Sequence, residues 1–264
     1  LSKAQWQQDI ELLTTKIKRH HPNPWRTISE LKFQQHLEEI ILASANQSRQ
    51  QTIAQLLAAV SMITRAGSDG QTGLWPLQQE TGFHILPLRL YWFTDGIYVV
   101  ATDISNQELE GQRLTAIAGR PIEQVIEKIR PYVSHENANW LKSWIPLYAL
   151  IPELLESLKL SEGLLVAITT ENKNAESSTR QIKAITSATY KKTFPEFLNN
   201  VILPVSSAAP LYLQNVFEQQ FWFRKINEKT LYLQYNQIVN VDKSGLSFSD
   251  FINLAEIEIK KYQL

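Results

Sequence analysis

Segment 67–74, which reads GSDGQTGL, gathers polar side chains between glycines directly after a stretch that we expect to be helical. Such a loop either ends the helix as a turn or forms one wall of an active site. In a turn, Gly70 adopts a positive φ and Asp69 hydrogen-bonds back to its own backbone. In an active site, Gln71 hydrogen-bonds a substrate carbonyl, which is a binding role, because an amide takes up no proton near pH 7.

Ser29 and Lys32 have the S-x-x-K spacing of serine acyltransferases, which places a hydroxyl and an ammonium group one helical turn apart. The accompanying S-D-N and K-T-G motifs are absent from the sequence. Ser29 also stands just before an amphipathic stretch. We therefore interpret Ser29 as a helix N-cap.

A metal site built from His20, His21, His36 and Glu39 is the next alternative. His36 and Glu39 lie one helical turn apart, but the sequence has no H-E-x-x-H motif. The adjacent His20 and His21 point in different directions. We expect no metal and no cofactor.

The composition excludes several other kinds of chemistry. Lys plus Arg balance Asp plus Glu at 26 each, and no basic stripe marks a nucleic-acid partner. The chain has no cysteine, so disulfides, thiolate catalysis and cysteine-bound zinc are absent.

A membrane-spanning helix needs about 20 predominantly apolar residues. The longest uncharged run, 197–217, is interrupted by asparagines and prolines, so we expect no membrane span. The first residue is Leu1, and no basic-then-apolar leader precedes it. We expect the chain to be a segment of a longer protein, such as a mature secreted form.

Apolar residues recur at helical spacing over 2–66, which predicts three amphipathic helices there. Downstream, β-rich runs at 85–93 and 96–103 predict a hairpin that turns at Thr94–Gly96. Gly111 marks a further turn, and Pro121 opens a helix at its first turn.

Later segments continue the mixed pattern. A longer helical stretch is predicted from about 137 to 160, and two strands are predicted at 163–170 and 179–186. A final strand pair turns at Asn227–Glu228, and a helix begins at Ser249. The fold class is therefore α+β.

Four segments, in this order, resemble the N-terminal half of the tail-specific (C-terminal processing) serine peptidases, in the branch of tricorn and the interphotoreceptor retinoid-binding protein repeats. They are WQQDIELLTTKIKRHHPNPW (6–25), GSDGQTGL (67–74), LEGQRLTAIAGRPIEQVIEKIRPYVSHEN (109–137) and TLYLQYNQI (230–238). The first is similar to the family's opening helix and the second to its GDGHT loop. The third is similar to the strand and helix of a PDZ-like domain, and the fourth to the strand that opens the catalytic domain.

The resemblance implies five regions. These are an N-terminal helical region (1–66), a loop (67–83), a PDZ-like domain with a helical insertion (84–187), a linker (188–210) and the beginning of a peptidase-type catalytic domain (211–264).

The resemblance also implies roles for individual residues, and it shows that one catalytic residue of the family, the histidine base, is replaced in this chain. Asp69, Gly70, Gln71 and Thr72 become candidates for an active-site wall. Gln71 stands where tricorn-like enzymes carry a histidine base. The family's nucleophilic serine and general-base lysine have no counterpart in the sequence, so we expect the chain alone to hydrolyse nothing.

A PDZ-like domain binds an extended peptide by adding it as a strand to a sheet edge. By resemblance the edge strand is FHILPLRL, with Ile85, Leu86 and Leu88 nearest the C-terminal residue of the peptide. The alternative is that this strand is fully paired and binds nothing.

The expected function is substrate recognition for a tail-specific serine endopeptidase, through capture of polypeptide C-termini. The alternatives are a catalytically silent relative that binds peptides or other ligands, and a purely structural module. The family's habit favours an extracytoplasmic location, either periplasmic or secreted.

Overall fold

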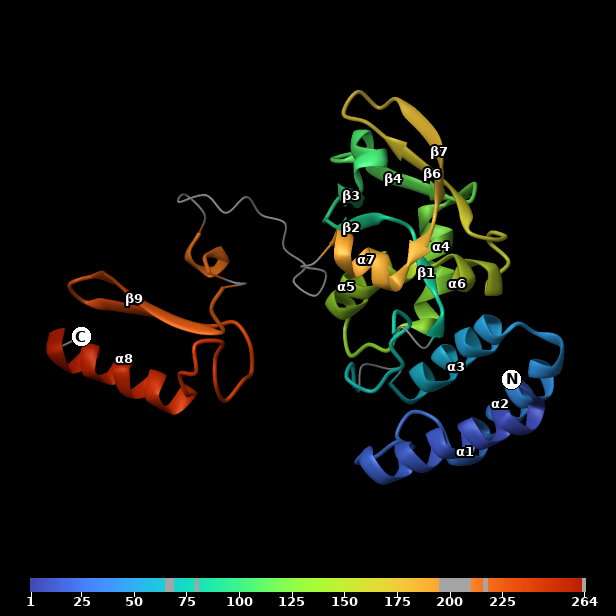
Figure 1. Ribbon diagram of the computed structural model, residues 1–264, viewed down its shortest axis with the longest axis horizontal. Coiled ribbons are helices and arrows are strands. Elements are labelled where there is room, and N and C mark those ends of the chain that lie inside the picture. The colour runs from blue at the N-terminus through green and yellow to red at the C-terminus, as the bar shows by residue number, and fades with distance from the viewer. Residues whose placement is uncertain (65–68, 79–80, 195–209, 216–217, 263–264) are drawn as a thin grey trace. The chain divides into compact units, whose positions relative to one another are not determined.

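The computed structural model describes residues 1–64, 69–78, 81–194, 210–215 and 218–262. The chain divides into two units, Leu1–Phe197 and Leu198–Leu264, each described on its own below (Figure 1). The mixture of helix and sheet defines an α+β fold, as the sequence predicts. Within the described residues, no helix combines the length and the apolar character that crossing a membrane requires.

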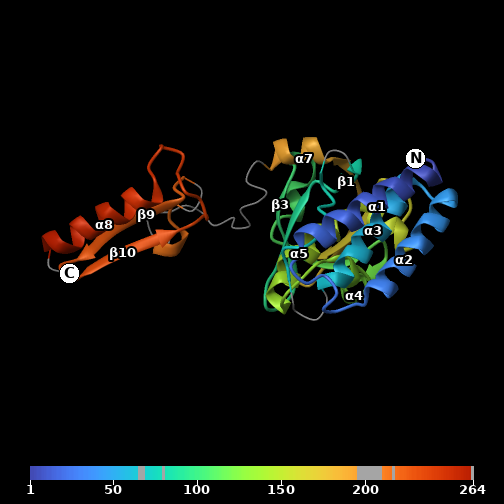
Figure 2. The same ribbon diagram turned by 90° about the horizontal axis from the view of Figure 1, so that it is seen from below.

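Three helices, α1 (Lys3–His20), α2 (Glu30–Ala43) and α3 (Arg49–Thr64), lie together at one end of the first unit (Figures 1 and 2). They appear where the helical spacing predicts them. The Ser29 hydroxyl accepts the Lys32 N–H at 3.3 Å, which confirms Ser29 as the N-cap of α2. The layer has its own buried core: Trp6, Ile10, Ile17, Phe33, Leu37, Ile40, Leu56, Ala59, Val60 and Ile63.

An antiparallel sheet forms the centre of the first unit, in the strand order β2-β3-β4-β6-β7. Its strands are β2 (Leu88–Trp92), β3 (Ile97–Thr102), β4 (Arg113–Ile117), β6 (Leu165–Glu171) and β7 (Ser177–Lys183), with the short β5 (Arg120–Pro121) paired to β4. The hairpin at Thr94–Gly96 is confirmed, since β2 and β3 pair directly across it. The sheet packs on a core that includes Leu114, Ile117 and Val125.

The predicted strand at 85–93 is divided at Pro87. Its first part, β1 (His84–Ile85), pairs with β8 (Ile185–Thr186), whereas its second part, β2, pairs with β3. Proline has no N–H to donate to a ladder, so a strand readily changes partner there. One β-rich run therefore serves two sheets.

The predicted helix at 137–160 is also divided. It forms α5 (Ala138–Tyr148) and α6 (Pro152–Ser157), because the backbone leaves the helical region at Ile151 and Pro152 starts a new helix. Two more helices flank the sheet: α4 (Ile122–Ile129), for which Pro121 is the N-cap and not the first helical residue, and α7 (Ser187–Thr193). Short 3₁₀ turns connect these elements: η1 (Ser44–Asn46), η3 (Ile104–Leu109) and η4 (Arg130–Tyr132).

The second unit contains the antiparallel pair β9 (Phe221–Asn227) and β10 (Thr230–Tyr235), followed by α8 (Phe248–Tyr262) and preceded by the 3₁₀ turn η5 (Leu211–Leu213). The turn after Asn227 and the helix near Ser249 appear as predicted. Phe221 packs at the centre of an aromatic cluster, 4.8 Å from Phe251 between ring centroids. These aromatic contacts join the helix to the ribbon.

Candidate functional site

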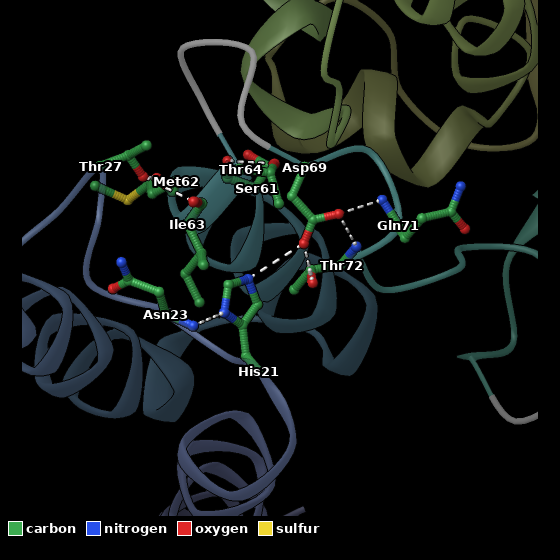
Figure 3. Close-up of polar contacts among 10 residues, drawn as sticks. All are labelled: His21, Asn23, Thr27, Ser61, Met62, Ile63, Thr64, Asp69, Gln71 and Thr72. Carbon is green, nitrogen blue, oxygen red and sulfur yellow. Dashed lines mark hydrogen bonds and ion pairs between the residues drawn. The ribbon is translucent and has the colours of Figure 1, made fainter.

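The loop that begins at Asp69 is tied to the end of α1. His21 Nε2 lies 3.2 Å from Asp69 Oδ2, and both side chains are partly buried. Asp69 Oδ1 accepts the backbone N–H groups of Gln71 and Thr72, at 2.7 and 3.2 Å (Figure 3). The Thr72 hydroxyl donates to Asp69 Oδ2 as well. The carboxylate is thus the centre of a network that joins the end of α1 to segment 69–72.

The hydrogen bonds fix the tautomer of His21. The backbone N–H of Asn23 donates to His21 Nδ1 at 3.0 Å, so Nδ1 carries a lone pair and Nε2 carries the proton given to Asp69. Both ring nitrogens are therefore engaged within the chain. A histidine in this state positions the loop and does not act as a base, because Nδ1 is already occupied.

Burial of the Asp69 carboxyl raises its pKa, but the opposing influences are larger in sum. The Thr72 hydroxyl, the backbone N–H groups of Gln71 and Thr72, and the neighbouring His21 together hold the pKa below its usual value. Asp69 is therefore ionised in the folded protein at neutral pH.

The structure separates the four wall candidates by role. Asp69 bonds back to its own loop, as a turn predicts, and Thr72 closes that turn. The Gln71 side chain is exposed and points away from Asp69 and His21, so only its backbone joins the network (Figure 3).

Gly70 differs from the prediction, because it has no positive φ. Its role is close packing: a Cβ at Gly70 would stand 3.0 Å from the Trp140 ring. Glycine is favoured here by a neighbour 70 residues away in the chain, Trp140, which no local pattern shows. The preceding residues of the loop, 65–68, lie outside the described residues.

An aromatic cleft adjoins this loop. It is lined by Gly70, Gly73, Leu74, Trp75, Val133, Ser134, Trp140, Trp144 and Tyr148. The Trp75 and Trp144 rings lie 4.8 Å apart between centroids, and Trp140 lies 6.4 Å from Trp144. The accessible volume is about 10 Å³, the space of a single water molecule, so the cleft is a shallow slot with aromatic walls. Trp140, Trp144 and Tyr148 form its α5 side.

The peptide-binding candidates Ile85, Leu86 and Leu88 lie in the core, each with no exposed side-chain surface. Their backbone groups have internal partners. The Leu86 N–H donates to the Leu150 carbonyl at 2.9 Å, and the Leu88 carbonyl accepts the Tyr190 hydroxyl at 2.8 Å. The side chains of all three residues are therefore inaccessible to a peptide.

Strand β2 stands at one end of the sheet order and pairs with β3 on one side. Phe93 donates its N–H to Gly96 across the hairpin, so Phe93 and the residues that alternate with it face β3. The backbone groups of Leu90 and Trp92 therefore face the other way. Among the residues that the structure describes, no strand pairs with β2 on that side, so Leu90 and Trp92 are the positions at which it presents a strand edge.

The proposed metal ligands are not brought together. His36 Nδ1 lies 3.2 Å from Glu39 Oε2 on the exposed face of α2, whereas His21 binds Asp69. Across the described ranges, no group of three histidine, aspartate or glutamate residues is arranged to hold a metal ion.

The His21–Asp69 pair was not predicted from the sequence. The sequence signal lies in the HHPNP segment, where Pro22 ends α1 and leaves His21 at the helix terminus. Only the tertiary fold shows that this terminus meets the loop after α3.

The chain can be compared with known proteins by its sequence and by its fold. No protein-family model and no curated protein matches the sequence. Solved structures do match, and they are of a serine protease with a tail-specific-protease-like fold. This likeness concerns the fold.

The matching structures are of CPAF, a chlamydial serine protease. A serine-to-alanine mutant of CPAF aligns with a TM-score of 0.56 and 11% identity, over 97% of this chain and 54% of that chain. Mature CPAF complexed with lactacystin aligns with a TM-score of 0.51 and 13% identity, over 69% of this chain and 35% of that chain. The chain therefore spans between about a third and about half of the length of these structures.

Proposed function

We propose that this chain is the substrate-recognition part of a tail-specific serine endopeptidase-like protein and that it binds polypeptide C-termini. The observation that carries the proposal is the CPAF-like fold, which extends over 97% of the chain. The four sequence segments that resemble the tail-specific family support it independently. An extracytoplasmic location accompanies the proposal, by resemblance to that family.

In this proposal the peptide adds along the free edge of β2. The backbone groups of Leu90 and Trp92 supply the main-chain hydrogen bonds, as in other cases of strand addition. The terminal residue of the peptide lies next to the segment of Ile85, Leu86 and Leu88. Helix α5 packs against β2, so it borders the site.

Asp69, Gly70, Gln71 and Thr72 form the wall of the site that faces the scissile bond in this scheme. Gln71 is suited to hydrogen-bond a substrate carbonyl, because its amide is exposed and free of the Asp69 network. The chemical step belongs to a serine and a lysine that this sequence does not contain. The chain by itself is expected to bind peptides without cleaving them.

The test is a calorimetric titration with decapeptides that differ only in a free carboxylate or an amide at the C-terminus. We expect saturable binding of the acid form and at least about tenfold weaker binding of the amide, because a charge-assisted bond is lost. Equal affinity for the two forms would refute C-terminal recognition.

A proline substitution locates the site. Leu90→Pro removes an edge-facing N–H without breaking the β2–β3 ladder, and we expect it to abolish peptide binding. The matched control is Gln181→Pro on β7 at the other end of the sheet. Gln181 pairs with Ala167, whose carbonyl already accepts the Ala118 N–H, so the Gln181 N–H also faces outward. This control should bind as the unmodified chain does.

A second candidate function is a catalytically silent binding relative. It is favoured by the occupied Nδ1 of His21 and by the outward direction of Gln71. Mass spectrometry of peptides incubated with the longest natural form of the protein separates the two. Cleavage products would support the peptidase. Peptides that stay intact although binding is saturated would support the silent relative.

A further inference from the structure

The two end strands of the sheet in the first unit expose different kinds of side chain. Strand β7 has the sequence SSTRQIK, and only its isoleucine, Ile182, is buried. Polar and charged residues of this kind discourage a further strand from pairing with a sheet edge. At the other end, Tyr91 on β2 is 44% exposed, and Phe93, which follows the strand, is 45% exposed. The exposed positions are therefore aromatic at the β2 end and polar at the β7 end.

The exposed aromatic residues form one cluster. Tyr91 and Phe93 are two residues apart, so they lie on the same face of the strand, and their ring centroids are 4.5 Å apart. Tyr98 pairs with Tyr91 across the β2–β3 ladder, and its ring lies 5.6 Å from that of Phe93 in an edge-to-face arrangement. Leu90 and Trp92, which alternate with these residues, pack against the core. The cluster therefore belongs to the outer face of the sheet.

A peptide that adds along β2, as the proposed function requires, has its C-terminus near Leu88. Because Leu88 begins the strand, this peptide runs antiparallel to β2. Its main chain bonds to Leu90 and Trp92, so the peptide residue opposite Tyr91 stands in a non-hydrogen-bonded pair. In such a pair the Cα atoms are only about 4.5 Å apart and the two side chains share one face. The side chain of that peptide residue, upstream of the C-terminal residue, therefore lies beside the Tyr91 ring.

We propose that the cluster of Tyr91, Phe93 and Tyr98 selects peptides that carry an aromatic side chain opposite Tyr91. Aromatic pairs that face each other across two strands stabilise the pairing, and a ring also reaches the diagonal neighbour, which is Phe93. This selectivity rests on the proposed function, because it needs a peptide at the β2 edge. It concerns a residue within the peptide and not its C-terminal residue.

The charges beside the cluster favour a neutral ring over a charged side chain. The Tyr98 hydroxyl donates to Asp95 at 2.9 Å, and Arg113 of β4 pairs with Tyr98 in the sheet. A lysine of the peptide would approach the arginine, and a glutamate would approach the aspartate. An uncharged ring meets neither repulsion.

The experiment uses a series of decapeptides with a free C-terminal carboxylate, each with a single phenylalanine at a different position of one serine–alanine host. Calorimetric titration of the whole chain gives the Kd of each peptide. We expect one upstream position to bind about three- to tenfold more tightly than the host, the size of an aromatic cross-strand pair with a diagonal contact. Lysine or glutamate at that position should give no such gain.

Three variants make the test specific. Tyr91→Ala should remove the gain, so that the phenylalanine peptide and the host peptide bind equally. Tyr91→Phe keeps the ring and should retain the gain. Leu165→Ala removes an exposed apolar side chain from β6, 56% exposed, and should leave the preference unchanged. The preference is a ratio of two affinities for the same variant, so a change in the stability of the variant does not alter it.

The outcomes separate this proposal from the proposed function. A phenylalanine preference that Tyr91→Ala removes and Tyr91→Phe retains would establish the cluster as a selective surface. Binding that needs the free carboxylate but has the same affinity for every peptide of the series would overturn the selectivity and leave C-terminal recognition standing. A preference that Tyr91→Ala leaves intact would have the same meaning. If no peptide of the series binds at millimolar concentration, both proposals fail together.

Discussion

His21 and Asp69 stand 48 residues apart in the sequence and 3.2 Å apart in the structure, with the imidazole Nε2–H directed at the carboxylate. The contact joins the end of α1 to the loop that follows α3. Because Asn23 occupies the other ring nitrogen, the pair holds the loop in place and leaves no free base. The predictions below test how much this contact and its neighbours contribute.

Asp69→Asn should destabilise the first unit by about 1–3 kcal/mol, because an amide cannot accept all the hydrogen bonds that converge on the carboxylate. Urea unfolding measured at pH 7 gives the change in the free energy of unfolding. The control is Asp9→Asn on the exposed face of α1, which should change stability by less than about 0.5 kcal/mol. Equal effects for the two variants would contradict a structural role of the network.

The stabilisation by Asp69 should depend on pH. Its pKa is lower in the folded chain than its ordinary value of 3.8, so the folded state favours the ionised form. The contribution is fully present above the ordinary pKa and is lost as the pH falls through the lower, folded pKa. The difference in unfolding free energy between the natural chain and Asp69→Asn should therefore narrow below about pH 4. A difference that is constant from pH 7 to pH 3 would be incompatible with this account.

Gly70→Ala should destabilise the chain by about 1–3 kcal/mol, because the added methyl group forces the Trp140 ring to move. The cost should shrink when Trp140 is first replaced by leucine, since the obstacle is then smaller. Thermal or urea unfolding of the four chains in this double-mutant cycle measures the coupling. Additive effects would show that the Gly70–Trp140 contact is not the cause.

Thr72→Val and Gln71→Ala form a matched pair in the same loop. Thr72→Val removes a hydroxyl that donates to Asp69, and we expect a loss of about 1 kcal/mol. Gln71→Ala keeps the backbone N–H that binds Asp69 and removes only an exposed side chain, so we expect less than about 0.5 kcal/mol. The reverse order in urea unfolding would show that the Gln71 amide has a structural partner.

Tyr190→Phe should cost about 1–3 kcal/mol, because it leaves the buried carbonyl of Leu88 without the hydroxyl that binds it. The ring itself remains packed on Phe194, at 4.7 Å between centroids. Differential scanning calorimetry gives the change in melting temperature. Tyr212→Phe, at a residue that is 65% exposed, is the control and should leave the melting temperature unchanged.

The sequence predicts the helices and strands of this chain well where a single period governs them. The helical stripe over 2–66 and the alternating runs on either side of Gly96 each reflect one buried face, which local spacing reveals. The divisions at Pro87 and Pro152 were missed, because a proline allows a change of partner without requiring one.

The candidate site was less predictable, for a physical reason. That Asp69 would cap its own turn follows from its side-chain length and needs only neighbouring residues. The contacts of His21 and Gly70 are instead made to residues far away in the sequence, and their geometry exists only after the elements have packed. From the sequence, Gly70 is accordingly interpreted as a turn glycine. In the structure its φ is not positive, and the lack of a Cβ matters because it lets the backbone pack against Trp140.

Segment 69–73 is held from two sides, by His21 at the end of α1 and by Trp140 on α5. This arrangement makes the helical layer and the aromatic cleft thermodynamically linked. Consider a molecule that binds against Trp140 more tightly when the His21–Asp69 contact is formed. By reciprocity, binding of that molecule must stabilise the His21–Asp69 contact by the same free energy. Slower hydrogen exchange at the end of α1 would then report the occupancy of a cleft that α1 does not line.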